Sequence, residues 1–299
     1  MGPWFPVRTI SAANLLAFGA VFTCACSSAT TPSLPQSPPL PQATWVQVWS
    51  DEFNGPAGAG VDSTKWSYQT GDGCSEGICG WGNNEKESYT RSPANVSLNG
   101  LGQLAITARP APAGLTCYYG ACRYTSAKIT TRGKLLAAQG RVEARIRIPA
   151  GQGLWPAFWM LGGGFPAVPW PACGELDIME GKGSQRATTS SAVHGPGYSG
   201  QTPFASSTTL ANGAFADDFH TFAVEWDSTH VAFFVDGAVH YGVSRSRMAV
   251  YGKPVLDNPY FVILNLAVGG VFDGDPATDA ILPATMLVDY VRVYQAPAR

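Results

Sequence analysis

Glu175-Leu-Asp-Ile-Met-Glu180 places three carboxylates within one predicted β-strand. Only 13% of the chain is Asp, Glu, Lys or Arg, and the run 155–179 that leads into these acids is largely apolar. A carboxylate on a half-buried sheet costs free energy unless it is hydrogen-bonded. The stretch therefore indicates a functional site. The alternative is an exposed strand edge that carries alternating acids.

The spacing of the acids predicts an irregular strand. Side chains alternate along a regular strand, so Glu175 and Asp177 would share one face and Glu180 would lie on the other. One extra residue, a β-bulge at Ile178 and Met179, brings all three acids onto one face. The apolar residues of the stretch then face the core.

Paired carboxylates on a rigid sheet suit glycoside hydrolysis. Retaining enzymes hold two carboxyl groups ~5–5.5 Å apart. The α-carbons of Glu175 and Glu180 would be roughly 13 Å apart along a strand, so the strand must curve and both side chains must lean inward. Asp177 between them would share a proton or a hydrogen bond with the nucleophile and keep the two pKa values apart.

Long motifs around the acids resemble glycoside hydrolase family 16, and more narrowly its bacterial laminarinases, which are endo-β-1,3-glucanases. The main motifs are GRVEARIRIP (140–149), GLWPAFWML (153–161) and WPACGELDIMEG (170–181), with supporting segments at 81–85, 192–198, 218–226, 264–270 and 286–294. The resemblance extends from Trp45 to Tyr294. It implies that Glu175 is the nucleophile, Glu180 the acid/base with a raised pKa, and Asp177 their assistant, with retention of anomeric configuration.

The remainder of the chain predicts an all-β fold. Short runs rich in Val, Ile, Phe and Tyr are typical of strands; they lie at 104–108, 141–148, 221–226 and 231–235, with a hairpin turn at Asp236-Gly237. No helical periodicity extends over ten residues. About 250 residues of such strands form one β-sandwich or jelly roll. The resemblance implies the same concanavalin A-like fold, with substrate in a concave cleft.

Aromatic side chains near the acids are candidates for sugar binding. Trp155 and Trp159 flank Pro156, which favours a loop feeding a strand over a helix. Their flat faces suit pyranose rings, and the resemblance implies that they bind glucosyl units. The alternative is core packing, because Trp buries a large area. Trp170 is a further candidate.

Polar substrate contacts follow from the resemblance. It implies that His194 faces the cleft near the acid/base, and that Asn83 and Arg141 hydrogen-bond sugar hydroxyls on the non-reducing side. The alternatives are an Asn in a Gly-rich turn and a solvated strand Arg. We expect His220 to pack and to hold Trp226 or a neighbouring loop.

No cofactor is expected for catalysis. The resemblance implies a possible structural calcium ion far from the cleft, with ligands at Glu52, Gly100 and Asp289. Carboxylate and backbone oxygens are the ligands that Ca²⁺ prefers. With a net charge of −2 and no basic patch, the chain has no electrostatic support for a nucleic-acid partner.

The chain divides into three predicted parts: a signal peptide or lipoprotein signal at 1–29, a Pro/Ser/Thr-rich linker at 30–43 and a family 16 catalytic domain at 44–299. The apolar run 10–23 is too short for a comfortable membrane span and is typical of a signal peptide. Cys24 or Cys26 would carry a lipid anchor, and cleavage after Ala29 is the alternative. We expect a secreted or surface-anchored monomer.

The cysteine spacing predicts disulfides if the protein is exported. Cys74 and Cys79 are spaced C-x₄-C, and Cys117 and Cys122 repeat that spacing. In an exported protein these four predict two disulfides, within each loop or between the loops. Cys173 is left over and is expected to be a small buried hydrophobe.

The sequence thus predicts a secreted retaining endo-β-1,3-glucanase that acts on laminarin-like β-glucan. Two other functions stay open. A wall-remodelling transglycosylase would use the same intermediate, and a non-catalytic β-glucan-binding protein would keep the sandwich without needing the acids. The presence of Glu175, Asp177 and Glu180 argues against the second.

Overall fold

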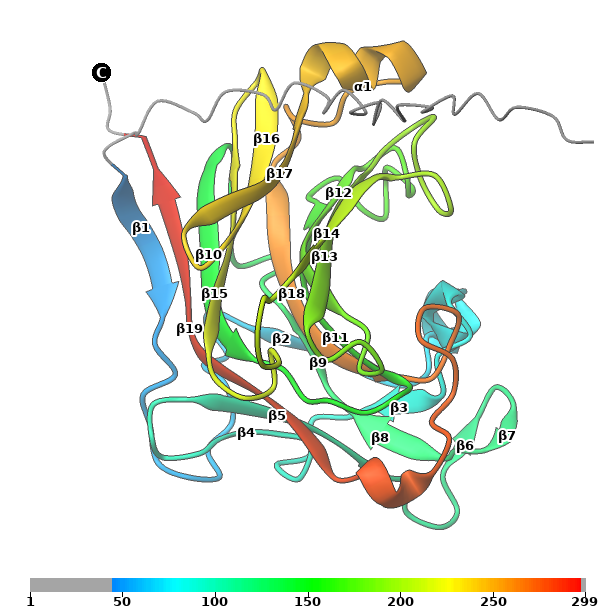
Figure 1. The fold of residues 1–299 in the computed structure, drawn as a ribbon. Coiled ribbons are helices and arrows are strands. Elements are labelled where there is room, and N and C mark those ends of the chain that lie inside the picture. The colour runs from blue at the N-terminus through cyan, green and yellow to red at the C-terminus, as the bar shows by residue number, and fades with distance from the viewer. Residues whose placement is uncertain (1–44, 297–299) are drawn as a thin grey trace, which may run out of the picture. The chain divides into compact units, whose positions relative to one another are not determined.

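The computed structural model describes residues 45–296, in which two large β-sheets pack face to face (Figure 1). The ten-stranded sheet contains, in order, β17 (Ala238–Ser244), β16 (His230–Val235), β15 (His220–Trp226), β10 (Gly140–Arg147), β19 (Ala284–Gln295), β5 (Leu104–Pro110), β8 (Tyr124–Ser126) and β3 (Glu87–Tyr89), with β1 (Val46–Asp51) on β19 and β4 (Val96–Leu98) on β5. The seven-stranded sheet contains β14 (Phe204–Thr209), β13 (Thr188–His194), β12 (Glu175–Gly181), β11 (Leu154–Gly162), β18 (Tyr260–Val268), β9 (Lys128–Thr130) and β2 (Ser67–Gln69). The predicted jelly-roll sandwich is confirmed.

Short elements complete the fold. They are the two-stranded pair β6 (Thr116–Cys117) and β7 (Gly120–Ala121), the helix α1 (Arg245–Tyr251), and the 3₁₀ turns at Cys74–Glu76, Cys79–Gly82 and Asp279–Ile281. Throughout the described part of the chain, α1 is the one α-helix and has seven residues, as the missing helical periodicity predicts. The hairpin turn is also confirmed, because Asp236 and Gly237 both have positive φ between β16 and β17.

The core lies between the two sheets and follows from alternation along the strands. On β10, Val142, Ala144 and Ile146 are buried in the core, and the residues between them face outward. On β11, Leu154, Phe158 and Met160 belong to the same core. Burial of apolar side chains is the dominant favourable contribution to the stability of such a sandwich. The opposite face of β11 is left for the site.

The four strands expected from composition are present as β5, β10, β15 and β16. One prediction is wrong. Trp155 and Trp159 lie on β11 itself rather than on a loop before a strand. Pro156 is tolerated there because the pairing of β11 with β12 ends at Ala157, so the missing N–H interrupts none of those pairs.

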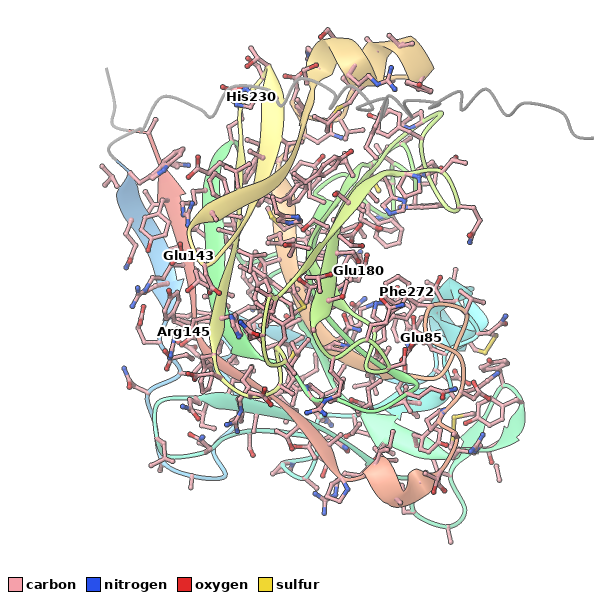
Figure 2. The ribbon with its side chains drawn as sticks, in the orientation of Figure 1. Glu85, Glu143, Arg145, Glu180, His230 and Phe272 are labelled. Atoms are coloured by element: carbon pink, nitrogen blue, oxygen red, sulfur yellow. A yellow bond between two sulfur atoms is a disulfide. The ribbon has the colours of Figure 1, made fainter. Side chains whose placement is uncertain are left out.

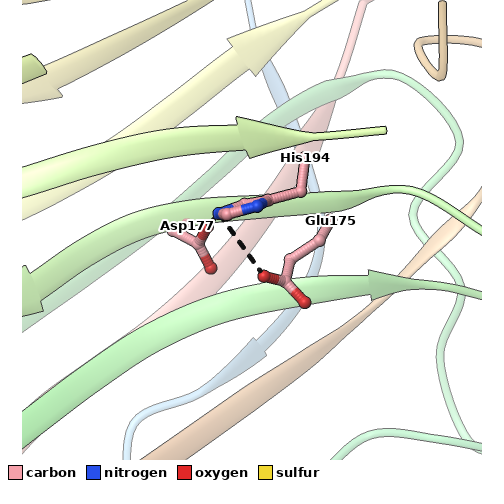
Figure 3. Close-up of side chains that lie close together, drawn as sticks. All are labelled: Glu175, Asp177 and His194. Atoms are coloured by element: carbon pink, nitrogen blue, oxygen red, sulfur yellow. Dashed lines mark ion pairs between the residues drawn. The ribbon is translucent and has the colours of Figure 1, made fainter. Parts of the chain in front are cut away.

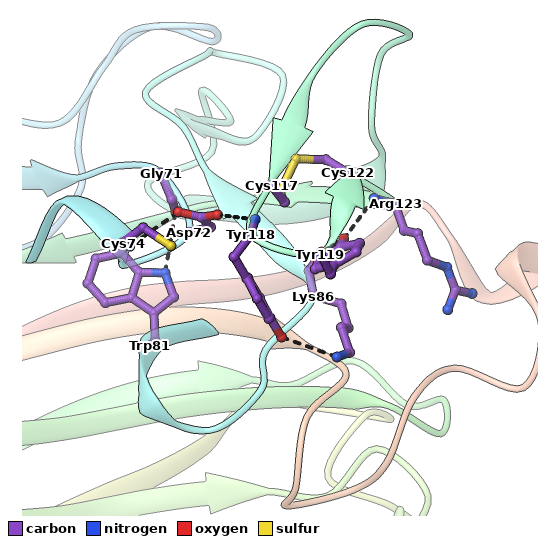
Figure 4. Close-up of a disulfide and its surroundings, with 10 residues drawn as sticks. All are labelled: Gly71, Asp72, Cys74, Trp81, Lys86, Cys117, Tyr118, Tyr119, Cys122 and Arg123. Carbon is purple, nitrogen blue, oxygen red and sulfur yellow. Dashed lines mark hydrogen bonds between the residues drawn. A yellow bond between two sulfur atoms is a disulfide. The ribbon is translucent and has the colours of Figure 1, made fainter. Parts of the chain in front are cut away.

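The cysteines pair within their own loops, as Cys74–Cys79 and Cys117–Cys122. Figure 4 shows how the two loops meet: the Asp72 carboxylate accepts hydrogen bonds from the backbone N–H groups of Cys74 (3.2 Å) and Tyr118 (2.6 Å). Cys173 is a free, buried thiol, as predicted, and burial raises its pKa to about 11.

The predicted signal at 1–29 and linker at 30–43 lie outside the described residues. Between residues 45 and 296, no helix is long and apolar enough to span a bilayer.

Replacing Phe158 by Ala should destabilise the domain strongly. Phe158 is fully buried on the core face of β11, and removing such a side chain costs about 3–5 kcal/mol. Val250, at 72% exposure on α1, is the control, since surface changes of this kind stay within about 0.5 kcal/mol. Denaturant unfolding followed by Trp fluorescence measures both. A Phe158→Ala loss as small as that of Val250→Ala would contradict the assigned core.

Candidate active site

The β-bulge in β12 is present and places all three acids on one face of the seven-stranded sheet. In the pairing with β13, Asp177 lies opposite Ala192 and Glu180 opposite Ser190, so β12 contains one residue more than its partner. The apolar residues of the stretch, which are Leu176, Ile178 and Met179, all pack into the core. The predicted bulge and its orientation are confirmed. We call the opposite face, which carries the acids, the site face.

His194 on β13 lies directly beside two of the acids, as Figure 3 shows. Its Nε2 atom is 3.2 Å from Asp177 Oδ2 and 3.8 Å from Glu175 Oε1. The pairing of Glu175 with His194 across β12 and β13 fixes this approach. From the sequence, His194 is expected near the acid/base Glu180; the structure places it beside Asp177 and Glu175.

Burial raises the pKa of every acid in the cluster. It raises the pKa of Asp177 to about 8, and burial together with the charge of Asp177 raises the pKa of Glu180 to about 8. Burial and the Asp177 charge also hold the pKa of Glu175 well above its usual value. The raised pKa of Glu180 agrees with the expectation that this residue carries a proton at neutral pH. Because the pKa values of Glu175 and Asp177 are raised as well, the protonation states of the three carboxyls depend on one another.

Trp155 contacts Glu180 through its indole nitrogen, which donates a 3.1 Å hydrogen bond to Glu180 Oε1. One face of the indole stacks on Phe272 with ring centroids 4.6 Å apart and an angle of 24° between the planes. Figure 2 shows Phe272 and Glu180 from the loop and the strand that converge here. Trp155 therefore supports the acid directly, and only its other face is available to a sugar.

Trp159 lies on the same face, next to Asp177 of β12, and begins a chain of hydrogen bonds. Its indole nitrogen donates to Asn265 Oδ1 at 2.7 Å, and Asn265 donates to the Tyr89 hydroxyl at 3.1 Å. The Tyr89 hydroxyl donates to Glu85, whose other oxygen accepts from Asn83 Nδ2, both at 3.1 Å. Asn83 is thus linked to the site face through buried polar groups.

Lys128 supplies a buried positive charge beside this chain. Its Nζ lies 4.3 Å from the Trp81 ring centroid and 5.0 Å from that of Trp159. Burial lowers the pKa of Lys128, and the charges of Glu85, Glu87 and Glu175 oppose that change. A cation held over aromatic faces near carboxylates stabilises their ionised forms.

Glu175 and Glu180 share one face, the Trp155 indole donates a hydrogen bond to Glu180, and aromatic rings surround both acids. This arrangement suits acid/base chemistry on a carbohydrate. A comparison with known families decides the assignment: the model described as "Glycosyl hydrolases family 16" matches residues 83–292. The chain belongs to glycosyl hydrolase family 16. It is therefore a glycoside hydrolase.

Relatives and solved structures agree with this family. The chain is 37% identical to glucan endo-1,3-beta-glucosidase A1 of Niallia circulans over 83% of its own length and 37% of that protein. It is 36% identical to a beta-glucanase of Rhodothermus marinus, over 84% of this chain and 85% of the relative. The laminarinase catalytic domain of Thermotoga maritima superimposes with a TM-score of 0.80 at 40% identity, covering 85% of this chain and 99% of that one. The endo-beta-1,3-glucanase of Pyrococcus furiosus gives 0.81 at 40% identity, covering 89% and 100%.

Trp170 also lies near the acids of this family 16 domain. Its ring centroid is 5.9 Å from that of His194, and 42% of the residue is exposed. An exposed indole beside the acids is free to meet a ligand. Its predicted role in sugar binding stays a prediction, as do those of Trp159, His194 and Asn83.

Arg141 is a wrong prediction. It lies on β10 in the ten-stranded sheet and faces away from the core, so the whole sandwich separates it from the acids. Its guanidinium is ion-paired with Glu143 and with Glu225. Figure 2 shows Glu143, its neighbour on β10, across the sandwich from Glu180. Arg141 is thus a charged residue on a strand, as in the alternative interpretation, but its charge is balanced by ion pairs rather than by solvent.

Two of the three expected calcium ligands are held in ion pairs. Glu52 is ion-paired with Arg292 at 2.8 Å, Asp289 with Arg145 at 2.8 Å, and Gly100 packs in a turn against Ala57. A guanidinium group thus neutralises each carboxylate, and a structural calcium ion at these residues stays a prediction. Among residues 45–296, the one cluster of three potential metal-ligating side chains is that of Glu175, Asp177 and His194.

His220 is a structural residue, as expected. Its Nδ1 lies 2.7 Å from Asp236 in the hairpin turn, and its ring packs on Phe215 with centroids 4.8 Å apart. It therefore holds the neighbouring loop rather than Trp226.

Sequence reasoning gave no role to Lys128, Asn265, Glu85 or Phe272. The signal for Asn265 was available, because it is the lone polar residue in the otherwise apolar strand β18. Glu85 is the last residue of the segment 81–85, and no chemistry was assigned to it from the sequence. Lys128 and Phe272 had no local signal, since only the packed fold places them against Trp159 and Trp155.

Replacing Trp155 by Phe should move the pH dependence of hydrolysis. The indole hydrogen bond lowers the pKa of Glu180 from what burial alone would give, so its loss raises that pKa. Activity that needs protonated Glu180 falls as the pH rises through about 8 in the wild type. A hydrogen bond of about 0.5–1.5 kcal/mol corresponds to an upward shift of roughly 0.4–1 pH unit in the upper limb of kcat/KM.

Trp159→Phe is the matched control, because its lost hydrogen bond goes to Asn265 and not to an acid. Its upper limb should stay at the wild-type pH. Equal shifts in both variants, or a downward shift in Trp155→Phe, would contradict the role of the indole donor.

Proposed function

We propose that this family 16 protein is a retaining endo-β-1,3-glucanase that hydrolyses laminarin-like β-glucans by double displacement. The observation that carries the proposal is the bulge, which puts Glu175 and Glu180 on one face with Asp177 between them. Relatives named as glucan endo-1,3-beta-glucosidases and structures named as laminarinases support β-1,3-glucan as the substrate.

In the first step, Glu180 donates its proton to the glycosidic oxygen while Glu175 attacks the anomeric carbon. Glu180 is suited to donate, because its pKa of about 8 keeps it protonated at neutral pH. The leaving chain departs with a new hydroxyl group. A covalent glycosyl–Glu175 ester remains.

Glu175 must be ionised to attack, whereas burial, the largest effect on this carboxyl, raises its pKa; a neutral Asp177 removes the second effect that raises it. With a pKa raised to about 8, Asp177 is neutral at pH 7. Its charge then no longer opposes ionisation of Glu175, and the nearby His194 and Lys128 both favour the carboxylate form by lowering the pKa of Glu175. A protonated Asp177 can also donate a hydrogen bond to that carboxylate.

In the second step, water replaces the departed chain. Glu180, now ionised, removes a proton from the water as it attacks the anomeric carbon, and the Glu175 ester breaks. Two inversions give net retention. Bound sugar would be contacted by side chains that lie around the acids or are connected to the site face by hydrogen bonds, namely Trp159, Asn83, His194 and Trp170.

We further propose that the protein is exported, either released or lipid-anchored. The apolar run 10–23 supports export. The disulfides Cys74–Cys79 and Cys117–Cys122 are the kind that persist in oxidising compartments.

Hydrolysis and its stereochemistry test the proposal together. The purified protein should release reducing ends from laminarin, less from lichenan and none from agarose or cellulose, and NMR of the first product should show the β-anomer. Glu175→Gln should lower kcat by at least about 10⁴-fold, because it removes the nucleophile, while glucan binding persists.

Glu175→Ala with added azide provides the sharper control. The small anion can occupy the space of the lost carboxylate and attack an activated aryl glycoside, which yields an α-glycosyl azide. Initial release of the α-anomer by the wild type would refute Glu175 as the nucleophile. Products longer than the substrate would favour the transglycosylase, and no release from any glucan would favour the binding protein.

A further inference from the structure

The core side of the β12 bulge contains a polar contact that the reaction does not use directly. Ile178 and Met179 are the two residues that β12 places where β13 supplies one, and that one residue is Ser191. Ser191 is 1% exposed and points into the sandwich. A hydroxyl group buried in an apolar core costs free energy unless it is hydrogen-bonded, so the hydrogen bonds of Ser191 indicate its structural role.

Ser191 satisfies the backbone at the bulge. Ile178 is absent from the paired positions of β12 with both β11 and β13. The Ser191 hydroxyl donates a 2.8 Å hydrogen bond to the Ile178 carbonyl oxygen. Removing the hydroxyl would take this hydrogen bond from the carbonyl, and a lost hydrogen bond of this kind costs about 0.5–1.5 kcal/mol.

His240 reaches the same hydroxyl from β17 of the opposite sheet. Its Nε2 lies 3.0 Å from Ser191 Oγ. Because the serine proton is directed at Ile178, the serine oxygen accepts from His240 Nε2–H, and the imidazole is the Nε2-protonated tautomer. His240 Nδ1 is buried without a partner among the described residues, as an unprotonated nitrogen can be. Burial also lowers the pKa of His240 to about 4, so the ring stays neutral.

We propose that Ser191 and His240 are positioning residues that hold the bulge and thereby keep Glu180 on the face of Glu175. A regular β12 would satisfy the Ile178 carbonyl by ordinary pairing but would turn Glu180 toward the core. The Ser191–His240 pair offers the carbonyl a partner only in the bulged form. The inference rests on the proposed function, since it concerns the residue that acts as the acid.

The test separates acid-dependent from acid-independent chemistry. A 2,4-dinitrophenyl β-laminaribioside has a leaving group that departs without protonation, whereas laminarin needs the proton from Glu180. Ser191→Ala should lower kcat/KM for laminarin by about 10–100-fold, part of the 10²–10⁴ that general acid catalysis supplies. The dinitrophenyl substrate should lose less than about 3-fold, since its reaction lacks that contribution. The loss for laminarin should lie in kcat rather than KM.

Further variants keep the result interpretable if Ser191→Ala is unstable. Ser191→Thr keeps the hydroxyl and should restore the wild-type ratio of the two substrates. His240→Phe keeps a ring but removes the donor, and should shift the ratio in the same direction as Ser191→Ala by a smaller factor. Val193→Ala, a core-facing change on the same strand, should lower stability without changing the ratio.

The outcomes distinguish the two proposals. If the wild type turns over neither substrate, the proposed function fails and the inference falls with it. If the wild type turns over both but Ser191→Ala lowers them equally, the proposed function stands and the positioning role is overturned. A ratio that changes as much in Val193→Ala as in Ser191→Ala would also overturn it, because loss of stability alone would then explain the effect.

Discussion

One extra residue in β12 is the constraint on which the site depends. Two-residue alternation divides any regular strand between core and surface, and an acid at the position of Glu180 would then enter an apolar core. The bulge gives Ile178 and Met179 to the core and Glu180 to the site face. The one extra residue therefore determines both which side chains of β12 pack in the core and which carboxylates share the site face.

Electrostatics adds a second consequence of that arrangement. Burial raises the pKa of each acid, the charge of Asp177 raises the pKa of both Glu175 and Glu180, and the charge of Glu180 raises that of Glu175. His194 opposes these shifts at both Glu175 and Glu180, Lys128 opposes them at Glu175, and the Trp155 donor opposes them at Glu180. The three acids lie on one strand, so the differences between their environments come from their neighbours.

Features that depend on local periodicity could be predicted from the sequence. The bulge, β5, β10, β15, β16 and the turn at Asp236 follow from alternation and turn chemistry within a few residues. Arg141 could not be placed, because alternation gives the face of a strand but not which sheet the strand joins. The Asn265 and His240 contacts were also out of reach, since their partners come from strands distant in sequence.

The loop after β18 shows how such distant contacts shape the site. Phe272 stacks on Trp155, and the Val271 N–H donates to the Asn83 carbonyl at 2.9 Å. Asp273 accepts from the Gly153 N–H at 2.9 Å, just before Trp155 on β11. One loop thus ties the residue that supports the acid to the segment that carries Asn83. Because Phe272 covers one indole face and Glu180 takes the indole N–H, Trp155 is constrained first as a partner of the acid, and any sugar it meets must use the face that remains.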